Sequence, residues 1–327
     1  MKQMKKIILT SLFYCLLLPL FAQQDTQYGQ YVFNGLYINP AYAGYKDEIY
    51  LQAFFRAQWT GIKGAPQSLS VSIDAPIKNE KIGLGAIVTK DKIGAQNAIN
   101  ATGNFAYRLP MNREETKYLA FGLGIGIIQM SLNGSQLHAV ETGDTRIPTN
   151  FESKTVPDVR VGAQYSSERF FIGFAANNLF TQSLSSLKDF SLMNINHQPH
   201  FYLTVATYFK LQNEIILKPA FLIKDDINGP TSLDLNAFLL FKERLWLGAV
   251  YRTSVKFYPK SNLQPDLSSK SAIGLITEFF VKPNFRIGYG YDYSLNKLRT
   301  YDSGSHEISI GYYLNTIRSQ KKICNCF

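Results

Sequence analysis

In the stretch Leu119-Ala120-Phe121-Gly122-Leu123-Gly124-Ile125-Gly126-Ile127, every second residue is large and apolar, and the residues between are alanine or glycine. Successive side chains of a β-strand point to opposite faces, so a period of two predicts a strand with one apolar and one narrow face. A soluble sandwich would carry charged residues on its outer face, whereas a membrane barrel turns its apolar face to lipid. The stretch therefore predicts a strand of a membrane barrel.

The same alternation continues on both sides of this stretch. Leu69, Val71 and Ile73 oppose serines and Asp74, and the aromatic residues of 283–293 oppose glycines and two charged residues. From Glu48 onward we expect about fourteen strands, each near the ~9–11 residues that a tilted strand needs to cross a bilayer. Their predicted ranges are 48–59, 67–75, 81–90, 97–109, 117–130, 157–166, 169–178, 199–209, 214–223, 230–241, 244–255, 270–280, 283–293 and 305–314.

The connections between these ranges provide a second, independent indication. Those after even-numbered strands are short, such as Ser167–Glu168 and Lys242–Glu243, and those after odd-numbered strands tend to be longer, such as Ser131–Val156 and Leu179–Gln198. A bacterial barrel has short periplasmic turns and longer extracellular loops, whereas a soluble sandwich has no reason to separate them. The sequence thus predicts an all-β fold, a transmembrane antiparallel β-barrel of about 14 strands over 48–314.

The two ends of the chain do not follow the strand pattern. Residues 1–22 contain three lysines, then an apolar run too short to span a bilayer, then Leu20-Phe21-Ala22, which predicts a signal peptide. We expect residues 23–47 to lie in the periplasm or to plug the lumen. Residues 315–327 are expected to form a periplasmic tail.

The charge composition limits which kinds of molecule the protein can bind. The 327 residues carry a formal net charge of +10, 18% charged and 14% aromatic residues. Lysine and arginine are scattered singly through the β-patterned segments of a chain predicted to be exported, so a nucleic-acid partner is excluded. Basic rims facing the anionic headgroups of outer-membrane lipid explain the charge better.

No catalytic, cofactor-binding or metal-binding set is evident. The sequence has no Gly-x-Ser-x-Gly elbow, phosphate loop or nucleotide fingerprint. His138, His197, His200 and His306 are interpreted as exposed loop histidines or, for His306, the start of a strand; Pro199 and the lack of a third ligand argue against a metal site. Cys324 and Cys326 are too close in sequence to pair easily, which leaves free thiols or an intermolecular disulfide. The sequence therefore predicts no enzyme and no cofactor.

Nine charged residues fall on the predicted inner faces of the strands. They allow two explanations: a selective channel or a surface that grips an inserted segment, and, favoured here, an ordinary polar lumen whose charges pair across strands. The residues are Arg56, Arg108, Arg160, Lys218, Asp234, Arg252, Glu278, Arg286 and Asp292.

The most distinctive sequence precedes and follows the first predicted strand. It comprises Gln30-Tyr31-Val32-Phe33-Asn34, Ile38-Asn39-Pro40-Ala41-Tyr42-Ala43-Gly44 and Arg56-Ala57-Gln58-Trp59-Thr60-Gly61-Ile62-Lys63-Gly64-Ala65-Pro66. Asn-Pro and Ala-Gly favour turns, so residues 39–44 are expected to form a compact turn structure rather than a helix.

At these residues the chain resembles the PorP/SprF family of outer-membrane proteins linked to the type IX secretion system of Bacteroidetes. Gly83-Leu84-Gly85 and Asp91-Lys92-Ile93-Gly94 add to the resemblance, while Gly35 departs from the proline of many relatives. The resemblance carries no active-site residues. The motif positions, without an assigned role, are Tyr31, Asn34, Asn39, Pro40, Tyr42, Gly44, Arg56, Trp59, Gly61 and Pro66.

The resemblance implies a non-enzymatic barrel in the cell outer membrane. Such a barrel would assist the secretion or surface anchoring of specific large cell-surface proteins with C-terminal type IX signal domains, together with other components of the secretion system. The alternative is an outer-membrane channel for small or hydrophobic solutes with residues 23–47 as a plug. The state of the lumen distinguishes the two.

Overall fold

A computed structural model describes residues 28–314 of the chain except 47, 78–80, 138–149, 181–197, 213, 261–262 and 264–268. The predicted signal peptide, the predicted tail with Cys324 and Cys326, and both His138 and His197 lie outside the described residues. No helix in the described part of the chain is long and apolar enough to cross a membrane.

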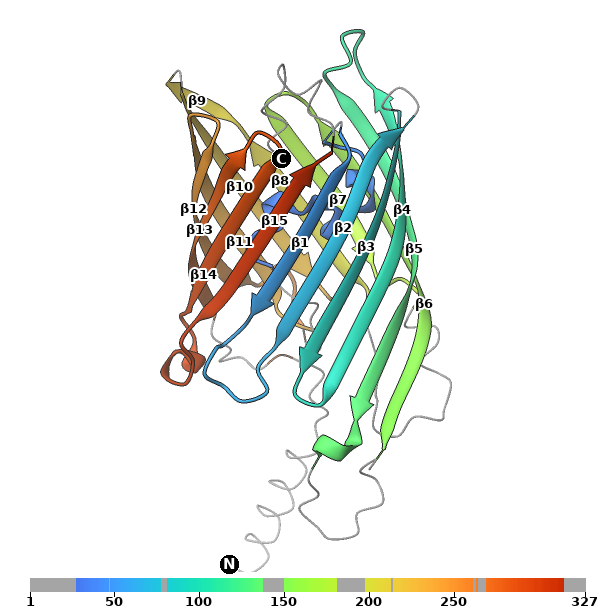
Figure 1. The fold of residues 1–327 in the computed structure, drawn as a ribbon, viewed down its shortest axis with the longest axis vertical. Coiled ribbons are helices and arrows are strands. Elements are labelled where there is room, and N and C mark those ends of the chain that lie inside the picture. The colour runs from blue at the N-terminus through green and yellow to red at the C-terminus, as the bar shows by residue number, and fades with distance from the viewer. Residues whose placement is uncertain are drawn as a thin grey trace, which may run out of the picture.

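The strands form one closed antiparallel ring (Figure 1). Neighbours along the chain pair with each other, and β1 pairs with β15 to close the ring. β8 and β9 both pair with β10 and are separated by Tyr208 alone, so they count as one wall position in a barrel of 14 strands. The strands are β1 (Tyr50–Ala57), β2 (Gln67–Ile77), β3 (Ile82–Ile93), β4 (Gln96–Pro110), β5 (Tyr118–Asn133), β6 (Phe151–Ser166), β7 (Phe170–Asn177), β8 (His200–Thr207), β9 (Phe209–Gln212), β10 (Ile215–Asp225), β11 (Thr231–Phe241), β12 (Leu245–Val255), β13 (Lys270–Lys282), β14 (Phe285–Ser294) and β15 (Ser305–Tyr313).

The predicted fold class is confirmed, and each predicted range overlaps an observed strand. Several strands end a few residues later than predicted, and the largest difference is at β5 and β6, which stay paired as far as Asn133↔Phe151, so both ends of the predicted loop 131–156 belong to the hairpin. The ladder continues because paired backbone groups satisfy each other's hydrogen bonds after the strands have left the lipid. The apolar alternation fades at that point, and this is why the sequence pattern ended the strands too early.

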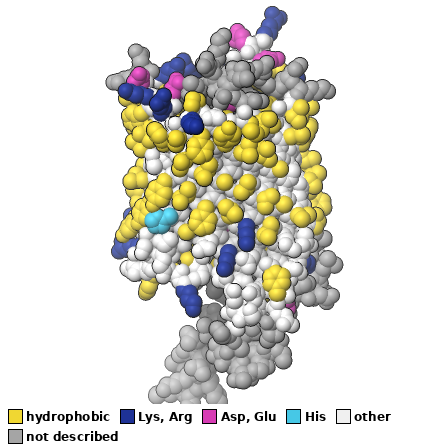
Figure 2. Space-filling view, in the orientation of Figure 1, with side chains coloured by type: hydrophobic (Ala, Val, Ile, Leu, Met, Phe, Trp, Pro, Cys, Tyr) yellow, Lys and Arg dark blue, Asp and Glu magenta, His cyan; other side chains and the backbone are white. Residues whose placement is uncertain are grey.

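The lipid-facing surface follows the alternation seen in the sequence. Leu69, Val71 and Ile73 are 43–51% exposed, whereas Ser68, Ser70 and Ser72 between them are buried toward the lumen. Apolar side chains gather in a belt across the face of the barrel seen in Figure 2, called the apolar band below. The end of the barrel with turns such as 167–169 and 242–244 is called the short-turn end, and the opposite end the long-loop end; short turns face the periplasm.

Candidate functional site: the lumen and residues 28–46

Residues 28–46, called the inner segment below, lie inside the barrel. They include three short helices, η1 (Tyr31–Phe33), α2 (Gly35–Ile38) and η2 (Pro40–Tyr42), and nearly all of their side chains are buried. The segment begins beside residues of the long-loop half of the lumen and ends beside the short-turn end, where β1 starts (Figure 1). The core of the molecule is therefore inside the ring.

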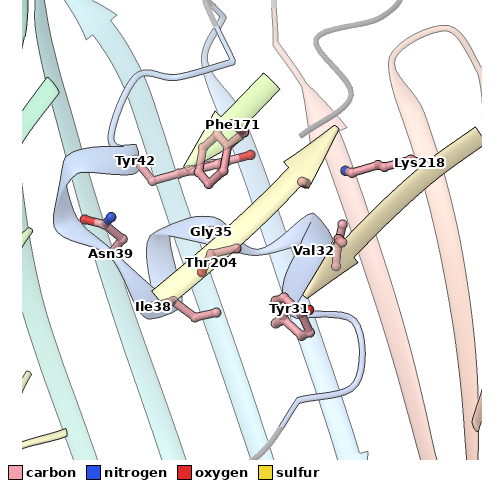
Figure 3. A pocket seen from close by; sticks show the side chains of 11 residues that line it. Tyr31, Val32, Gly35, Ile38, Asn39, Tyr42, Phe171, Thr204 and Lys218 are labelled. Carbon is pink, nitrogen blue, oxygen red and sulfur yellow. The ribbon is translucent and has the colours of Figure 1, made fainter. Parts of the chain in front are cut away.

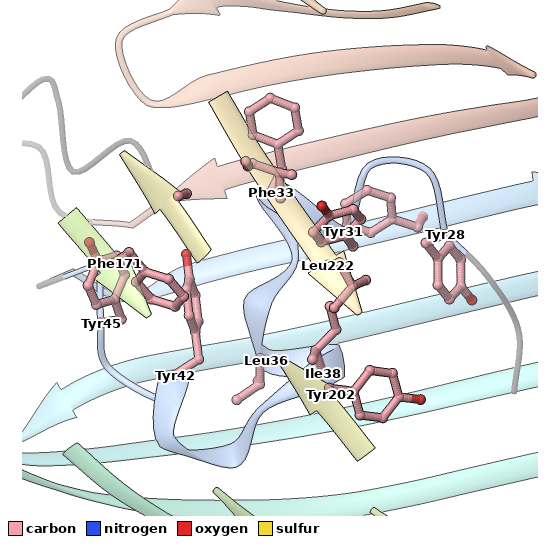
Figure 4. Close-up of a cluster of buried hydrophobic side chains, with 14 of the residues drawn as sticks. Tyr28, Tyr31, Phe33, Leu36, Ile38, Tyr42, Tyr45, Phe171, Tyr202 and Leu222 are labelled. Carbon is pink, nitrogen blue, oxygen red and sulfur yellow. The ribbon is translucent and has the colours of Figure 1, made fainter. Parts of the chain in front are cut away.

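Aromatic side chains of the inner segment pack against the barrel wall (Figure 4). Phe33 lies 5.4 Å from Phe238 and 6.1 Å from Trp246, measured between ring centroids. Tyr42 lies 6.3 Å from Phe171 of β7. These edge-on and tilted contacts bury large apolar areas, which is the main favourable term for holding a segment in a lumen.

Glycines of the wall leave room for the backbone of the inner segment. A Cβ added to Gly83 of β3 would overlap the carbonyl oxygen of Ala43, and one added to Gly122 of β5 would overlap the amide nitrogen of Ala41. The narrow face identified from the sequence is therefore the face on which the inner segment lies.

Asn39 fixes the centre of the inner segment. Its side-chain oxygen accepts a hydrogen bond from the Ala41 amide at 2.9 Å, and its Nδ2 donates to the carbonyls of Ala163 and Phe174 at 3.2 and 3.3 Å. Pro40 begins η2, where a missing N–H costs nothing. The expected compact turn at 39–44 is present, and the difference from the expectation is that Pro40–Tyr42 form one 3₁₀ turn, which the asparagine cap and the proline start.

We expect Asn39→Ala to cost about 1–3 kcal/mol of unfolding free energy, because it removes the cap and leaves two buried carbonyls without their donor. Asn39→Ser keeps a neutral capping oxygen but lacks the side-chain amide, so its cost should lie between those of wild type and alanine. Urea unfolding of the three proteins in detergent measures the order. Equal midpoints for the serine and alanine variants would show that the cap contributes nothing.

A buried carboxylate holds the start of the inner segment. Glu307 of β15 accepts hydrogen bonds from the amides of Gly29 and Gln30 at 2.8 and 2.9 Å. The same carboxylate pairs with Arg56 of β1 at 3.0 Å, and Arg56 also pairs with Asp292 of β14 at 2.6 Å. The arginine therefore joins three strands across the seam where the ring closes.

The ion pairs continue around the wall. Arg252 of β12 pairs with Asp292 at 3.5 Å and with Asp234 of β11 at 2.9 Å, and Lys224 of β10 lies 3.8 Å from Asp234. Together with Arg56 and Glu307, these side chains form one connected network, called the lumen network below. Because every member is paired, the burial of these charges is compensated in this arrangement.

Two further arginines donate to backbone carbonyls of the inner segment. Arg286, which also pairs with Glu278, donates to the Phe33 carbonyl at 3.2 Å. At the short-turn end, Arg108 donates to the Gly44 carbonyl at 2.7 Å, while Asp74 accepts from the Gly44 amide at 3.0 Å. Gly44 adopts φ +70°, a backbone conformation that favours glycine, and it lies against Gly83. A side chain at this position would therefore be both conformationally strained and too close to the wall.

The prediction of nine inward-facing charges is confirmed, since all nine are buried in the barrel. The two explanations left open by the sequence are both partly correct, because the charges pair with one another and also grip a segment. The sequence interpretation missed Asp158, which pairs with Arg160 at 3.1 Å, as well as Lys224 and Glu307. Alternation with Ser305 and Ser309 could have placed Glu307 on the inner face.

The structure divides the family-motif positions into two places. Seven lie in the lumen, and Trp59, Gly61 and Pro66 lie in the β1–β2 loop at the long-loop end. There Trp59 has φ +47° and donates its amide to Ser305 Oγ at 3.1 Å, and Gly61 has φ +96°. The lumenal positions are Tyr31, Asn34, Asn39, Pro40, Tyr42, Gly44 and Arg56.

The two described histidines have different surroundings. His200 is 4% exposed and its Nδ1 lies 2.8 Å from the carbonyl of Gln198, so its interpretation as an exposed loop histidine was wrong. His306 lies in β15 with Nδ1 2.7 Å from the Tyr289 hydroxyl. Within the described ranges, no three His, Cys, Asp or Glu side chains are grouped so as to hold a metal ion.

A cavity of about 30 Å³ separates the inner segment from β7, β8 and β10 (Figure 3). It is lined by side chains of both, among them Tyr31, Tyr42, Phe171 and Lys218. A cavity of this size holds one or two water molecules and no larger solute.

The family model of the type IX secretion system membrane protein PorP/SprF matches residues 20–312. The chain belongs to this family. As a PorP/SprF barrel it is a protein of the cell outer membrane, and the resemblance seen in the sequence is confirmed. No curated protein matches the sequence.

Solved structures similar to this PorP/SprF chain are outer-membrane barrels. The CymD monoaromatic hydrocarbon channel is 10% identical, with a TM-score of 0.52 over 86% of this chain and 93% of that chain. A FadL homologue of Pseudomonas aeruginosa is 11% identical, with a TM-score of 0.47 over 85% and 93%. At such identities the likeness shows the barrel fold alone.

Proposed function

We propose that this PorP/SprF barrel is a non-enzymatic accessory of the type IX secretion system that assists the secretion or surface anchoring of specific large cell-surface proteins. Its clients would carry C-terminal type IX signal domains, and it would act beside other components of the system. Membership of the family supports the link to secretion.

The filled lumen is the observation that carries this proposal. Direct hydrogen bonds of its backbone or of Asn39 join the inner segment to β2, β4, β6, β7, β14 and β15. A solute path through the ring would require these contacts to break together. The surfaces left for function are the rims and the loops.

The long-loop end offers a suitable surface for a folded client. The β5–β6 hairpin extends through strands of 16 residues each, beyond the ~9–11 needed to cross the membrane, and Phe151 at its far end is 65% exposed. An extended β-hairpin with exposed aromatic residues suits the docking of a β-rich domain.

Two experiments test the proposal. Deleting the gene should reduce the surface display of one or a few large proteins, and those proteins should co-purify with the barrel from detergent-solubilised outer membranes, as identified by mass spectrometry. Trimming residues 131–156 should abolish co-purification, while the barrel still migrates as folded on unheated gels. An unchanged surface proteome in the deletion strain would remove the proposal.

The channel alternative makes an opposite prediction in planar bilayers. We expect the purified wild-type barrel to show no steady conductance, because the inner segment and its bonds close the lumen. Reconstitution at increasing protein concentration, with a porin as the positive control, measures this. Reproducible open channels from the wild-type protein would favour the solute channel.

A further inference from the structure

Two lysines of β3 face the lipid at the lower edge of the apolar band. The outward residues of β3 toward the long-loop end are Leu84, Ala86, Val88, Lys90 and Lys92, and both lysines are exposed. Thr89 and Asp91 alternate with these two lysines along β3 and face the lumen. A charge on the lipid face of a barrel is tolerated near the interface and disfavoured at mid-membrane, so Lys90 marks the outer edge of the hydrocarbon layer.

The neighbours of these lysines change from apolar to polar at the same level. Lys90 pairs in register with Leu69 and Ile99, whereas Lys92 pairs with Gln67 and Asn97. Basic side chains stand over this part of β3, below the apolar band (Figure 2). Two ammonium groups and two amides thus occupy the layer where lipid headgroups begin.

The loops bring the backbone next to a third lysine close to the end of β3. The Gly94 amide donates to the Gly64 carbonyl at 2.9 Å, which ties the β3–β4 turn to the β1–β2 loop. Lys63, the residue before Gly64, is exposed. In the described part of the chain, no carboxylate lies within salt-bridge distance of Lys63, Lys90 or Lys92, in contrast to the paired charges of the lumen.

We propose that Lys63, Lys90 and Lys92 bind the phosphate groups of a phosphorylated glycolipid of the outer leaflet. The acyl chains of such a lipid would lie along Leu69, Val88 and Ile99, and its phosphates at the lysine ammonium groups. Successive outward residues of a strand are about 7 Å apart, so Lys90 and Lys92 can reach separate phosphates or share one. The amides of Gln67 and Asn97 add donors for phosphate or sugar oxygens.

Native mass spectrometry of the purified full-length barrel tests this with bisphosphorylated lipid A as the probe. A triple variant, Lys63→Gln with Lys90→Gln and Lys92→Gln, should bind at least about tenfold more weakly, because each basic residue near an anionic headgroup adds to affinity. The matched control replaces three exposed lysines at the short-turn end, as Lys81→Gln with Lys117→Gln and Lys282→Gln, and should bind like wild type.

A second comparison uses the wild-type protein alone, so it does not depend on the folding of a variant. Dephosphorylated lipid A should bind at least about tenfold more weakly than the bisphosphorylated form. Equal binding of the two lipids, or equal binding by the triple variant and the control, would overturn the proposal. Neither outcome bears on secretion of a client.

Discussion

Replacing Arg56 by alanine is expected to destabilise the folded barrel by about 3–5 kcal/mol, the largest effect of any single side chain in the lumen. The change leaves the Asp292 and Glu307 carboxylates buried without the cation that joins them. It also weakens the binding of the inner segment, because the Glu307 carboxylate that loses its arginine accepts the hydrogen bonds of the Gly29 and Gln30 amides.

Equilibrium unfolding in urea, followed by tryptophan fluorescence, measures the effect of Arg56→Ala. Trp246 is 1% exposed and lies beside Phe33, so its emission reports on the inner segment as well as on the wall. Arg113→Ala in the exposed β4–β5 turn is the control and should change stability by less than about 0.5 kcal/mol. If both variants unfold at the same urea concentration, the lumen network does not hold the barrel together.

Replacing Gly122 by alanine is expected to displace the inner segment while the ring stays closed. The new methyl group would overlap the backbone of Pro40 and Ala41, and backbone atoms cannot move aside as a flexible side chain can. Overpacking of this kind costs about 1–3 kcal/mol, which should raise the open population of the segment by about fivefold to more than a hundredfold.

Chymotrypsin cleavage after Tyr42 and Tyr45, both buried in the wild-type barrel, measures that population. Gly103→Ala provides the matched control, because the nearest atom to its added Cβ is the Ile125 carbonyl oxygen at 3.8 Å. Cleavage of the Gly122→Ala protein should be at least about fivefold faster than that of the control. Identical cleavage rates would mean that the glycine face is not what admits the segment.

The ring could be predicted from the sequence because its determinants are local. A period of two, from Leu119 to Ile127 and in the other strands, assigns each side chain to the lipid or the lumen. The lengths of the connections then show which end of the barrel faces the periplasm and which faces the outside. Where the chain leaves the lipid, as at Phe151, the apolar half of the pattern disappears and the boundary was missed.

The contacts inside the lumen could be predicted only in part. Alternation put Arg56 and Asp292 on inner faces, but 236 positions separate them, and nothing in one sequence says that they meet. The motif positions around Asn39 were recognised without their role, because the partners of Asn39 are carbonyl oxygens, which have no side-chain signature. His200 was misjudged because its burial depends on β7, where it pairs in register with Asn177 and its Nδ1 lies 3.3 Å from the side-chain amide of Asn178.

The bonds between Glu307 and the first described residues constrain the order in which the molecule is assembled. Gly29 and Glu307 are 278 positions apart, so their contact closes a very long loop of chain, whose closure entropy the other contacts must offset. Because Glu307 belongs to the strand that pairs with β1, its carboxylate reaches its final place only when the last strand has paired with the first. The bonds to residues 29 and 30 therefore form when the ring closes or after it, and never before it.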